Sequence, residues 1–328
     1  MSPDRYPGDD GSLGTPDAPL DAGGHEVLDQ PGRTLIPVTG EGMVRPSRTL
    51  WGDAWTRLRK NKLAIAGLTW IIFIIAVTVS ADLWVPQHFA EPTSTAAASL
   101  QAPSADHPFG TDRIGRDVFS RVIYGARVSL AVGILAVSIS LVIGLALGSL
   151  SGYYGGLLDA FVMRTADIFF AFPYTLFAIA LLAVLGPSYR NVFIAIGILG
   201  WPSIARVLRS SILSVKENEY VDAARAMGAS DLRIMLRHIM PNAIAPIIVY
   251  GTMSIGGAII TEAALSYLGM GVQPPTPSWG GMLSEAKALM IPAPWLTVWP
   301  GFAILTTVLS FVLMGDGLRD ALDVKMKD

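Results

Sequence analysis

The sequence contains no cysteine and only four histidines, which removes support for several kinds of site. Without cysteine there is no structural disulfide and no thiolate ligand for a metal. The histidines are scattered, and neither an HExxH zinc motif nor a GxSxG nucleophile elbow occurs. No glycine-rich loop ends in GK[ST], so a P-loop nucleotide site is excluded. We therefore expect no enzyme, no metal site and no cofactor held by this chain.

Charged residues are also scarce. They make up 15% of the chain, while 52% of residues are hydrophobic and the mean hydropathy is +0.48. An ordinary soluble domain carries about 25% charged residues. This composition favours a polytopic membrane protein in contact with lipid. The net charge of −2 gives no reason to expect a nucleic-acid partner.

The first part of the chain has two distinct segments. Residues 1–48 are rich in proline, glycine and aspartate without apolar periodicity, which predicts a disordered cytoplasmic tail. In residues 49–62, Trp51, Trp55 and Leu58 share one helical face and basic residues follow. This pattern predicts an amphipathic helix at the membrane interface, or simply the basic flank of the first span.

Six apolar stretches follow, each long enough to cross a hydrocarbon core of about 30 Å. We predict an all-α fold with six transmembrane helices, at residues 63–85, 128–150, 159–185, 192–213, 243–268 and 295–314. Between and after them we expect an external segment at 86–127 and a cytoplasmic C-terminus at 317–328. Residues 128–316 would form the transmembrane core, with a cytoplasmic loop at 215–241. Lysine and arginine gather beside the span ends that share a side with both termini, which places the N- and C-termini in the cytoplasm.

The loop between the fourth and fifth predicted spans has the pattern of two short helices. In the first, Tyr220, Ala223, Ala224 and Met227 recur at i, i+3, i+4 and i+7, which predicts one apolar face. Gly228 follows where a helix end favours a residue that tolerates the left-handed conformation. The loop therefore presents an amphipathic surface to a partner.

The second helix of this loop follows at once. Ser230 is in the position to cap it, and Pro241 closes the unit. Its apolar stripe consists of Leu232, Met235, Leu236 and Ile239. Together the two helices predict a compact two-helix unit that another protein can bind.

Three of the charged residues inside predicted spans are candidates for a path or a buried ion pair. Arg164 and Asp167 are three residues apart, so they can neutralise each other on one helix or face a substrate path. Glu262 is expected to have no partner three or four residues away on its helix. It therefore lines a translocation path or packs at a polar interface.

The sequence of this two-helix unit resembles a known signature. Asp222-Ala223-Ala224, then Gly228, then Ile239-Met240-Pro241, is similar to the EAA motif of permease subunits in bacterial ABC importers of the type I fold. Asp222 stands where glutamate is usual, Met240 where leucine is usual, and His238 at the usual isoleucine position.

Other stretches narrow the resemblance. HPFGTDRIGRDVFSRVIYGARVSL at residues 107–130 resembles the C-type permease of dipeptide and oligopeptide importers. The runs GYYGG at 152–156, PSWGGMLSEA at 277–286 and GDGLRDALD at 315–323 agree with it. The resemblance covers about residues 49–328 and is more specific for the family than for the substrate.

The resemblance implies a bacterial cytoplasmic-membrane heterodimer with a homologous B-type permease. Two cytoplasmic ATPase subunits would bind ATP and Mg²⁺, and an extracytoplasmic peptide-binding protein would deliver the solute. The coupling residues would be Tyr220, Asp222, Ala223, Ala224, Met227, Gly228 and Pro241. Nickel and glutathione importers use related subunits, so nickel and glutathione are alternative solutes. A secondary transporter would need midplane coupling carboxylates, usually with more spans or an inverted repeat, and is disfavoured.

Overall fold

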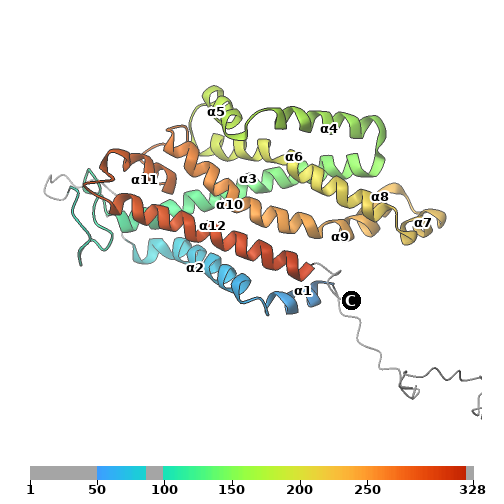
Figure 1. Cartoon of the computed structure of the whole chain (residues 1–328), viewed down its shortest axis with the longest axis horizontal. Coiled ribbons are helices and arrows are strands. Elements are labelled where there is room, and N and C mark those ends of the chain that lie inside the picture. The colour runs from blue at the N-terminus through green and yellow to red at the C-terminus, as the bar shows by residue number, and fades with distance from the viewer. Residues whose placement is uncertain (1–49, 86–98, 323–328) are drawn as a thin grey trace, which may run out of the picture. The chain divides into compact units, whose positions relative to one another are not determined.

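A computed structural model of the chain describes residues 50–85 and 99–322, and the regular elements within these ranges are helices (Figure 1). The only pairing of strand type among them is an isolated bridge between Thr111 and Asp117. The predicted all-α fold is therefore confirmed. The tail predicted at residues 1–48, residues 86–98 of the external segment and the last six residues lie outside the described residues.

The first two helices are α1 (Leu50–Leu58) and α2 (Lys62–Trp84), separated by a short turn. Asn61 caps α2, because its side chain accepts a hydrogen bond from the Ala64 backbone N–H at 3.1 Å. On α1, Ala54 and Leu58 are buried against the last turns of the final helix, whereas Trp55 is about half exposed with Arg59 over its ring. The helix thus has a buried and an exposed side, but Trp55 and Leu58, which the sequence places on one apolar face, differ in burial.

The next helix, α3 (Val118–Tyr154), is 37 residues long and begins ten residues before the predicted span. Asp117 starts it by accepting a hydrogen bond from the Ser120 backbone N–H at 2.8 Å. Its far half packs on α6 (Tyr189–Lys216) through three glycines, Gly144, Gly148 and Gly152. A Cβ on Gly148 would lie 2.8 Å from the Ala205 carbonyl oxygen, so the two backbones approach closely only because no side chain intervenes.

The third predicted span, at residues 159–185, is not one straight helix. It divides into α4 (Gly156–Ala171) and α5 (Tyr174–Leu185), which are bent by 91°. Pro173 causes the break, since proline disfavours the α conformation in the residue before it, and Phe172 is extended. The prediction of one continuous span at residues 159–185 is therefore wrong. The two helices form a broken span or a re-entrant loop.

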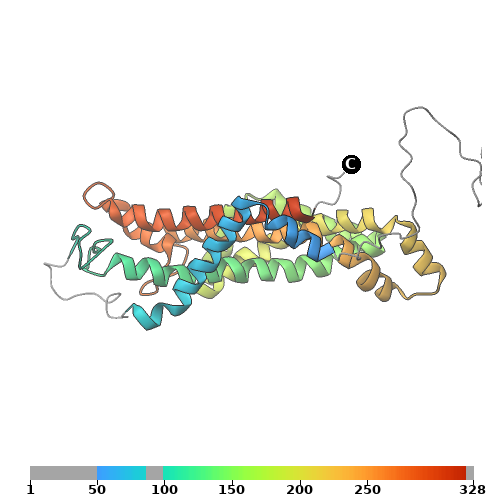
Figure 2. The same cartoon turned by 90° about the horizontal axis from the view of Figure 1, so that it is seen from below.

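The remaining long helices are α6, α10 (Ala245–Tyr267) and α12 (Trp295–Leu322). Together with α2 and α3 they make five described helices that are long and apolar enough to cross a membrane, and α4–α5 makes a sixth when counted as one span. Helix α12 continues to Leu322, past the predicted end of the last span at residue 314. Figure 2 shows α2 running obliquely across the bundle, where it contacts α12 and α3.

The short elements occupy the two ends of the bundle (Figure 1). One end carries α7 (Glu219–Ala226), α8 (Asp231–Arg233), the π-helix η3 (Ile234–Ile239) and α9 (Met240–Ala243), and we call it the α7 end. The other carries residues 99–117, α11 (Trp279–Glu285) and η4 (Lys287–Leu289), and we call it the α11 end. Because the chain folds this way, any site that joins the two ends must run along the long helices.

Candidate functional site

Helix α7 is followed by a turn in which one residue must adopt the left-handed backbone conformation. Gly228 has φ +79°, its N–H donates to the Arg225 carbonyl, and the Ala229 N–H donates to the Ala224 carbonyl at 3.1 Å. These two bonds form a Schellman motif, which satisfies carbonyls that the helix end leaves open. The glycine turn predicted from the sequence is present, and it fixes the angle at which the second helix leaves.

The face of α7 differs from the prediction in one residue. Val221 and Ala224 are buried in the apolar core that α7 shares with η3 and α6. Tyr220 and Met227 are instead 43% and 81% exposed, and Ala223 is also exposed. The predicted single stripe is thus wrong for Ala224, because the helix turns that residue inward. The outward surface consists of the other three apolar positions and Asp222, which pairs with Arg225 at 3.0 Å.

The second helix of the unit is wider than an α-helix in its middle. Pro241 has no N–H for the Arg237 carbonyl, and the six residues before Met240 form the π-helix η3. Ile234 and Ile239, five residues apart, are both buried as a π-helical turn requires. Leu232 and Leu236 point outward, 60% and 55% exposed, so the predicted stripe is split by the wider turn.

The unit is tied to the rest of the bundle by a short polar bridge. The Tyr153 hydroxyl at the end of α3 donates to Asp231 at 2.7 Å, and Lys216 Nζ donates to the Tyr153 carbonyl at 2.6 Å. Ser230 stands at the N-cap of α8, but its side chain makes no capping bond. The unit is therefore hydrogen-bonded to the end of α3, which is in turn hydrogen-bonded to the end of α6.

A groove with a volume of about 650 Å³ lies along α4–α5, α6 and α10. Four aromatic residues surround the break between α4 and α5, and small or hydroxylated residues of α10 face them. The Tyr174 hydroxyl donates to the Ile196 carbonyl at 3.2 Å, which holds α5 against α6. The aromatic residues are Phe169, Phe170, Phe172 and Tyr174, and those of α10 include Ser254, Gly257 and Thr261.

The charged residues predicted for a path do not line this groove. Glu262 is fully buried, and it accepts hydrogen bonds from Ser266 at 2.7 Å and from Ser129 at 3.1 Å. It therefore does have a partner four residues away, the uncharged Ser266, contrary to the prediction. The Trp279 backbone N–H donates to the same Ser129 hydroxyl at 3.3 Å, so Glu262 anchors the start of α11. Its place is a polar interface between helices.

The predicted pairing of Arg164 with Asp167 is also wrong. Asp167 instead accepts a hydrogen bond from Arg206 of α6 at 2.8 Å, and Arg164 is exposed without an ion pair among the described residues. Asp167 and Arg206 are 39 residues apart in the chain. Helix periodicity reports only neighbours on one helix, so it could not reveal a partner on another.

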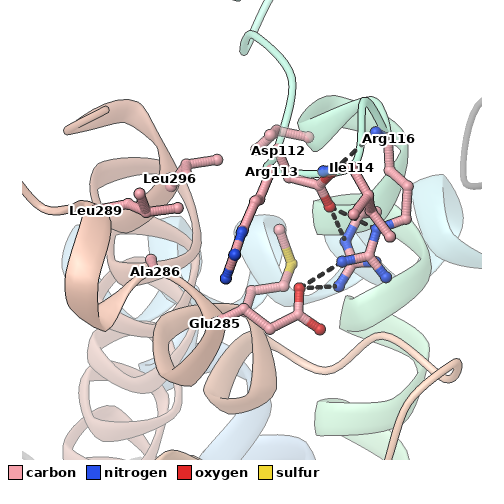
Figure 3. Close-up of a pocket in the computed structure, with 11 residues that line it drawn as sticks. Asp112, Arg113, Ile114, Arg116, Glu285, Ala286, Leu289 and Leu296 are labelled. Carbon is pink, nitrogen blue, oxygen red and sulfur yellow. Dashed lines mark hydrogen bonds and ion pairs between the residues drawn. The ribbon is translucent and has the colours of Figure 1, made fainter. Parts of the chain in front are cut away.

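The α11 end contains a pocket of about 230 Å³ whose walls carry both apolar and charged side chains (Figure 3). Arg116 pairs with Asp112 and with Glu285 of α11, and Arg121 donates to the same Glu285 carboxylate at 3.0 Å. The Arg113 side chain extends between Glu285 and the apolar wall, and it makes no ion pair among the residues the structure describes. The sequence analysis missed this cluster; only the i, i+4 spacing of Asp112 and Arg116 hinted at it.

The comparisons with known proteins agree with this architecture. The family model for the binding-protein-dependent transport system inner membrane component matches residues 144–328. The model for the N-terminal TM domain of oligopeptide transport permease C matches residues 49–103.

Individual relatives match over most of the chain. The dipeptide transport system permease protein DppC of Alkalihalophilus pseudofirmus is 48% identical over 84% of this chain and 90% of its own length. The glutathione transport system permease protein GsiD of Escherichia coli is 47% identical over 87% of this chain and 94% of its own length. A crystal structure of an amino acid ABC transporter with histidines aligns with 62% of this chain and 95% of that chain at a TM-score of 0.51 and 17% identity, which supports the fold alone.

Proposed function

The chain belongs to the family of inner membrane components of binding-protein-dependent transport systems, and from that premise we propose that it is the C-type permease subunit of an ATP-driven importer of di- and oligopeptides. The observation that carries the proposal is the order of the two matches, an oligopeptide permease C segment followed by the permease core. One relative is named for dipeptides and another for glutathione, itself a short peptide. Import of glutathione is therefore the alternative within the same class.

The α7–α9 unit is the part that we assign to coupling with an ATPase subunit. Its outer surface carries exposed apolar side chains at Tyr220, Met227, Leu232 and Leu236. Exposed apolar residues gathered at one end of a membrane bundle suit burial by a partner protein. The buried core beneath them makes the unit stiff, so a push on the surface reaches α3 and α6. ATP and Mg²⁺ would be bound by the partner.

The two ends take opposite sides of a bacterial cytoplasmic membrane in this proposal. The α7 end carries Lys216, Arg225, Arg233 and Arg237, which favours the cytoplasm by the positive-inside rule. The α11 end then faces outward, where a solute-binding protein docks. In this orientation both termini are cytoplasmic, a proposal supported by the packing of α1 against the last turns of α12 (Figure 1).

A homologous B-type permease would complete the path. The groove along α4–α6 and α10 opens to one side of this chain, so a second subunit is needed to enclose a solute. Closure of the ATPase pair would move the α7–α9 units together and open the groove outward; ATP hydrolysis would reverse this. The groove lining is aromatic and hydroxylated, which suits solutes whose side chains vary.

The test is reconstitution of the complex in proteoliposomes. The chain is co-expressed with its neighbouring genes, and ATP hydrolysis and uptake are measured with the binding protein and alanyl-alanine or glutathione. We expect ATPase subunits to co-purify and ATP hydrolysis and uptake to rise with the peptide. Stimulation by glutathione alone would favour the alternative. Uptake that follows an ion gradient without ATP would overturn the importer proposal.

A further inference from the structure

One exposed ion pair lies inside the membrane-spanning helices. Arg206 Nη2 donates to Asp167 Oδ1 at 2.8 Å, and the two side chains are 50% and 53% exposed. The Arg206 guanidinium carbon lies 4.5 Å from the centre of the Phe170 ring, a cation–π contact. Phe170 is itself 48% exposed. The three side chains thus form one surface on which a cation, an anion and an aromatic face are all accessible.

The pair lies away from the α7 end of both helices. Asp167 is eight residues beyond Asp159 on α4, about 12 Å at the helical rise of 1.5 Å per residue. Arg206 precedes Lys216, near the end of α6, by ten residues, or about 15 Å by the same rise. Charged side chains at such depth face a bundle interior or a water-filled cavity, because hydrocarbon cannot solvate them.

A second ion pair between the same two helices shows what a structural link looks like. Arg209 and Asp159 also join α6 to α4, but their side chains are only 31% and 19% exposed, and Ser151 of α3 donates a third hydrogen bond. This pair is covered and satisfied by the chain itself. The Arg206–Asp167 pair has no such third polar partner among the described residues, and its free hydrogen-bonding positions face outward.

The exposed pair continues the groove. Phe170 of α4 and Ser203 of α6 line it, and Asp167 and Arg206 follow one turn nearer the α7 end. None of the described residues that line the groove is charged. A solute that moves along the groove toward the α7 end therefore meets this pair as its first charged contact.

We propose that Arg206, Asp167 and Phe170 form a binding subsite for the charged termini of a short peptide. Arg206 N–H groups bind the terminal carboxylate, Asp167 accepts hydrogen bonds from the terminal ammonium, and Phe170 lies against the part of the peptide between the two charges. The proposal rests on the proposed peptide importer. A peptide with free ends carries both charges, so each partner exchanges one ion pair for another. Exposed ion pairs contribute little free energy, so the peptide binds this subsite weakly and can leave it again, as transport requires.

The absence of cysteine makes the test direct. Asp167→Cys is introduced into the full complex, and its modification by a membrane-impermeant charged thiol reagent is followed on this chain. Alanyl-alanine is then added, alongside the same dipeptide acetylated and amidated at its ends. We expect the reagent to modify this cysteine from water. The free dipeptide should slow the rate of modification by about fivefold, the size expected of an exposed charge contact. The blocked dipeptide should leave the rate unchanged. Ile168→Cys, also exposed but on another face, is the control whose rate neither peptide changes.

Three outcomes would overturn the subsite. They are no modification of Asp167→Cys in a complex whose ATP hydrolysis still responds to loaded binding protein, equal protection by both peptides, and equal protection at Ile168→Cys. Because uptake and ATP hydrolysis are first measured in the unsubstituted complex, failure of this test leaves the importer proposal intact. If Asp167→Cys does not assemble, Arg206→Gln and the exchange Asp167→Arg with Arg206→Asp are compared. Uptake per ATP hydrolysed should fall several-fold in Arg206→Gln and recover in the exchange; failure to recover would count against the subsite.

Discussion

At the α7 end the loop between α6 and α10 packs through apolar side chains, whereas at the α11 end the connecting segments are joined by buried charges and hydroxyls. The first core contains Val221, Ala224, Ile234 and Ile239, none more than 2% exposed. The second is organised by Glu262 and by Glu285, whose carboxylates receive serine hydroxyls and two arginines respectively. The two ends of one bundle thus use different means to position short helices.

The difference has a mechanical consequence. Apolar packing is non-directional, so the α7–α9 unit can keep its core while its outer surface is covered and uncovered by a partner. Hydrogen-bonded charges require fixed geometry, and breaking one leaves an unpaired group in a dry site. We therefore expect the α7 end to respond most to added charge and the α11 end to removed charge.

Adding a charge to the α7 core should have the largest effect. Ala224→Asp places a carboxylate in an apolar cluster, and we expect it to destabilise the unit by at least about 3 kcal/mol, the cost of an unpaired buried charge. ATPase subunits should then no longer co-purify. The matched control is Ala223→Asp, one residue away but exposed, which should leave the melting temperature within a few degrees. Equal losses of stability in the two variants would contradict the buried position of Ala224.

Removing a charge at the α11 end should rank second. Glu285→Ala leaves Arg121, whose side chain is 5% exposed, with Asp112 at 3.8 Å as its remaining ion-pair partner. We expect a loss of about 2 kcal/mol, below the range for fully buried pairs because Glu285 is partly exposed. Thermal unfolding of the purified complex measures it. Asp106→Ala, an exposed acid at the same end, is the control, and a similar shift there would refute the role of Glu285.

The sequence reveals these two ends unequally. Helical periodicity and a glycine at a helix end are local signals, so the two-helix loop and the turn at Gly228 could be predicted from residues close in the chain. The inward turn of Ala224 could not, because it depends on how α7 meets η3. The partner of Asp167 and one of the two serine partners of Glu262 lie on other helices, 39 and 133 residues away, and only packing brings them together.

The break at Pro173 shows the same limit in another form. The sequence marks the proline, and its effect on the preceding residue is predictable. The size of the bend is not, because the hydrogen bond from Tyr174 to α6 and the aromatic packing around it set the direction of α5. One continuous span was predicted where the structure has a bend of 91°.

The smallest expected effect tests whether the turn at the α7 end depends on backbone conformation alone. A Cβ on Gly228 would meet no atom within 4 Å, so Gly228→Ala introduces no clash, and its cost comes only from φ +79°. We expect a loss of about 1 kcal/mol, and less for Gly228→Asn, since asparagine tolerates this region better. Gly301→Ala is the matched control, because Gly301 also has open space but lies in α12, where alanine should be neutral or stabilising. Thermal unfolding of the three variants decides it, and a Gly228→Ala protein as stable as Gly301→Ala would show that the turn does not require glycine.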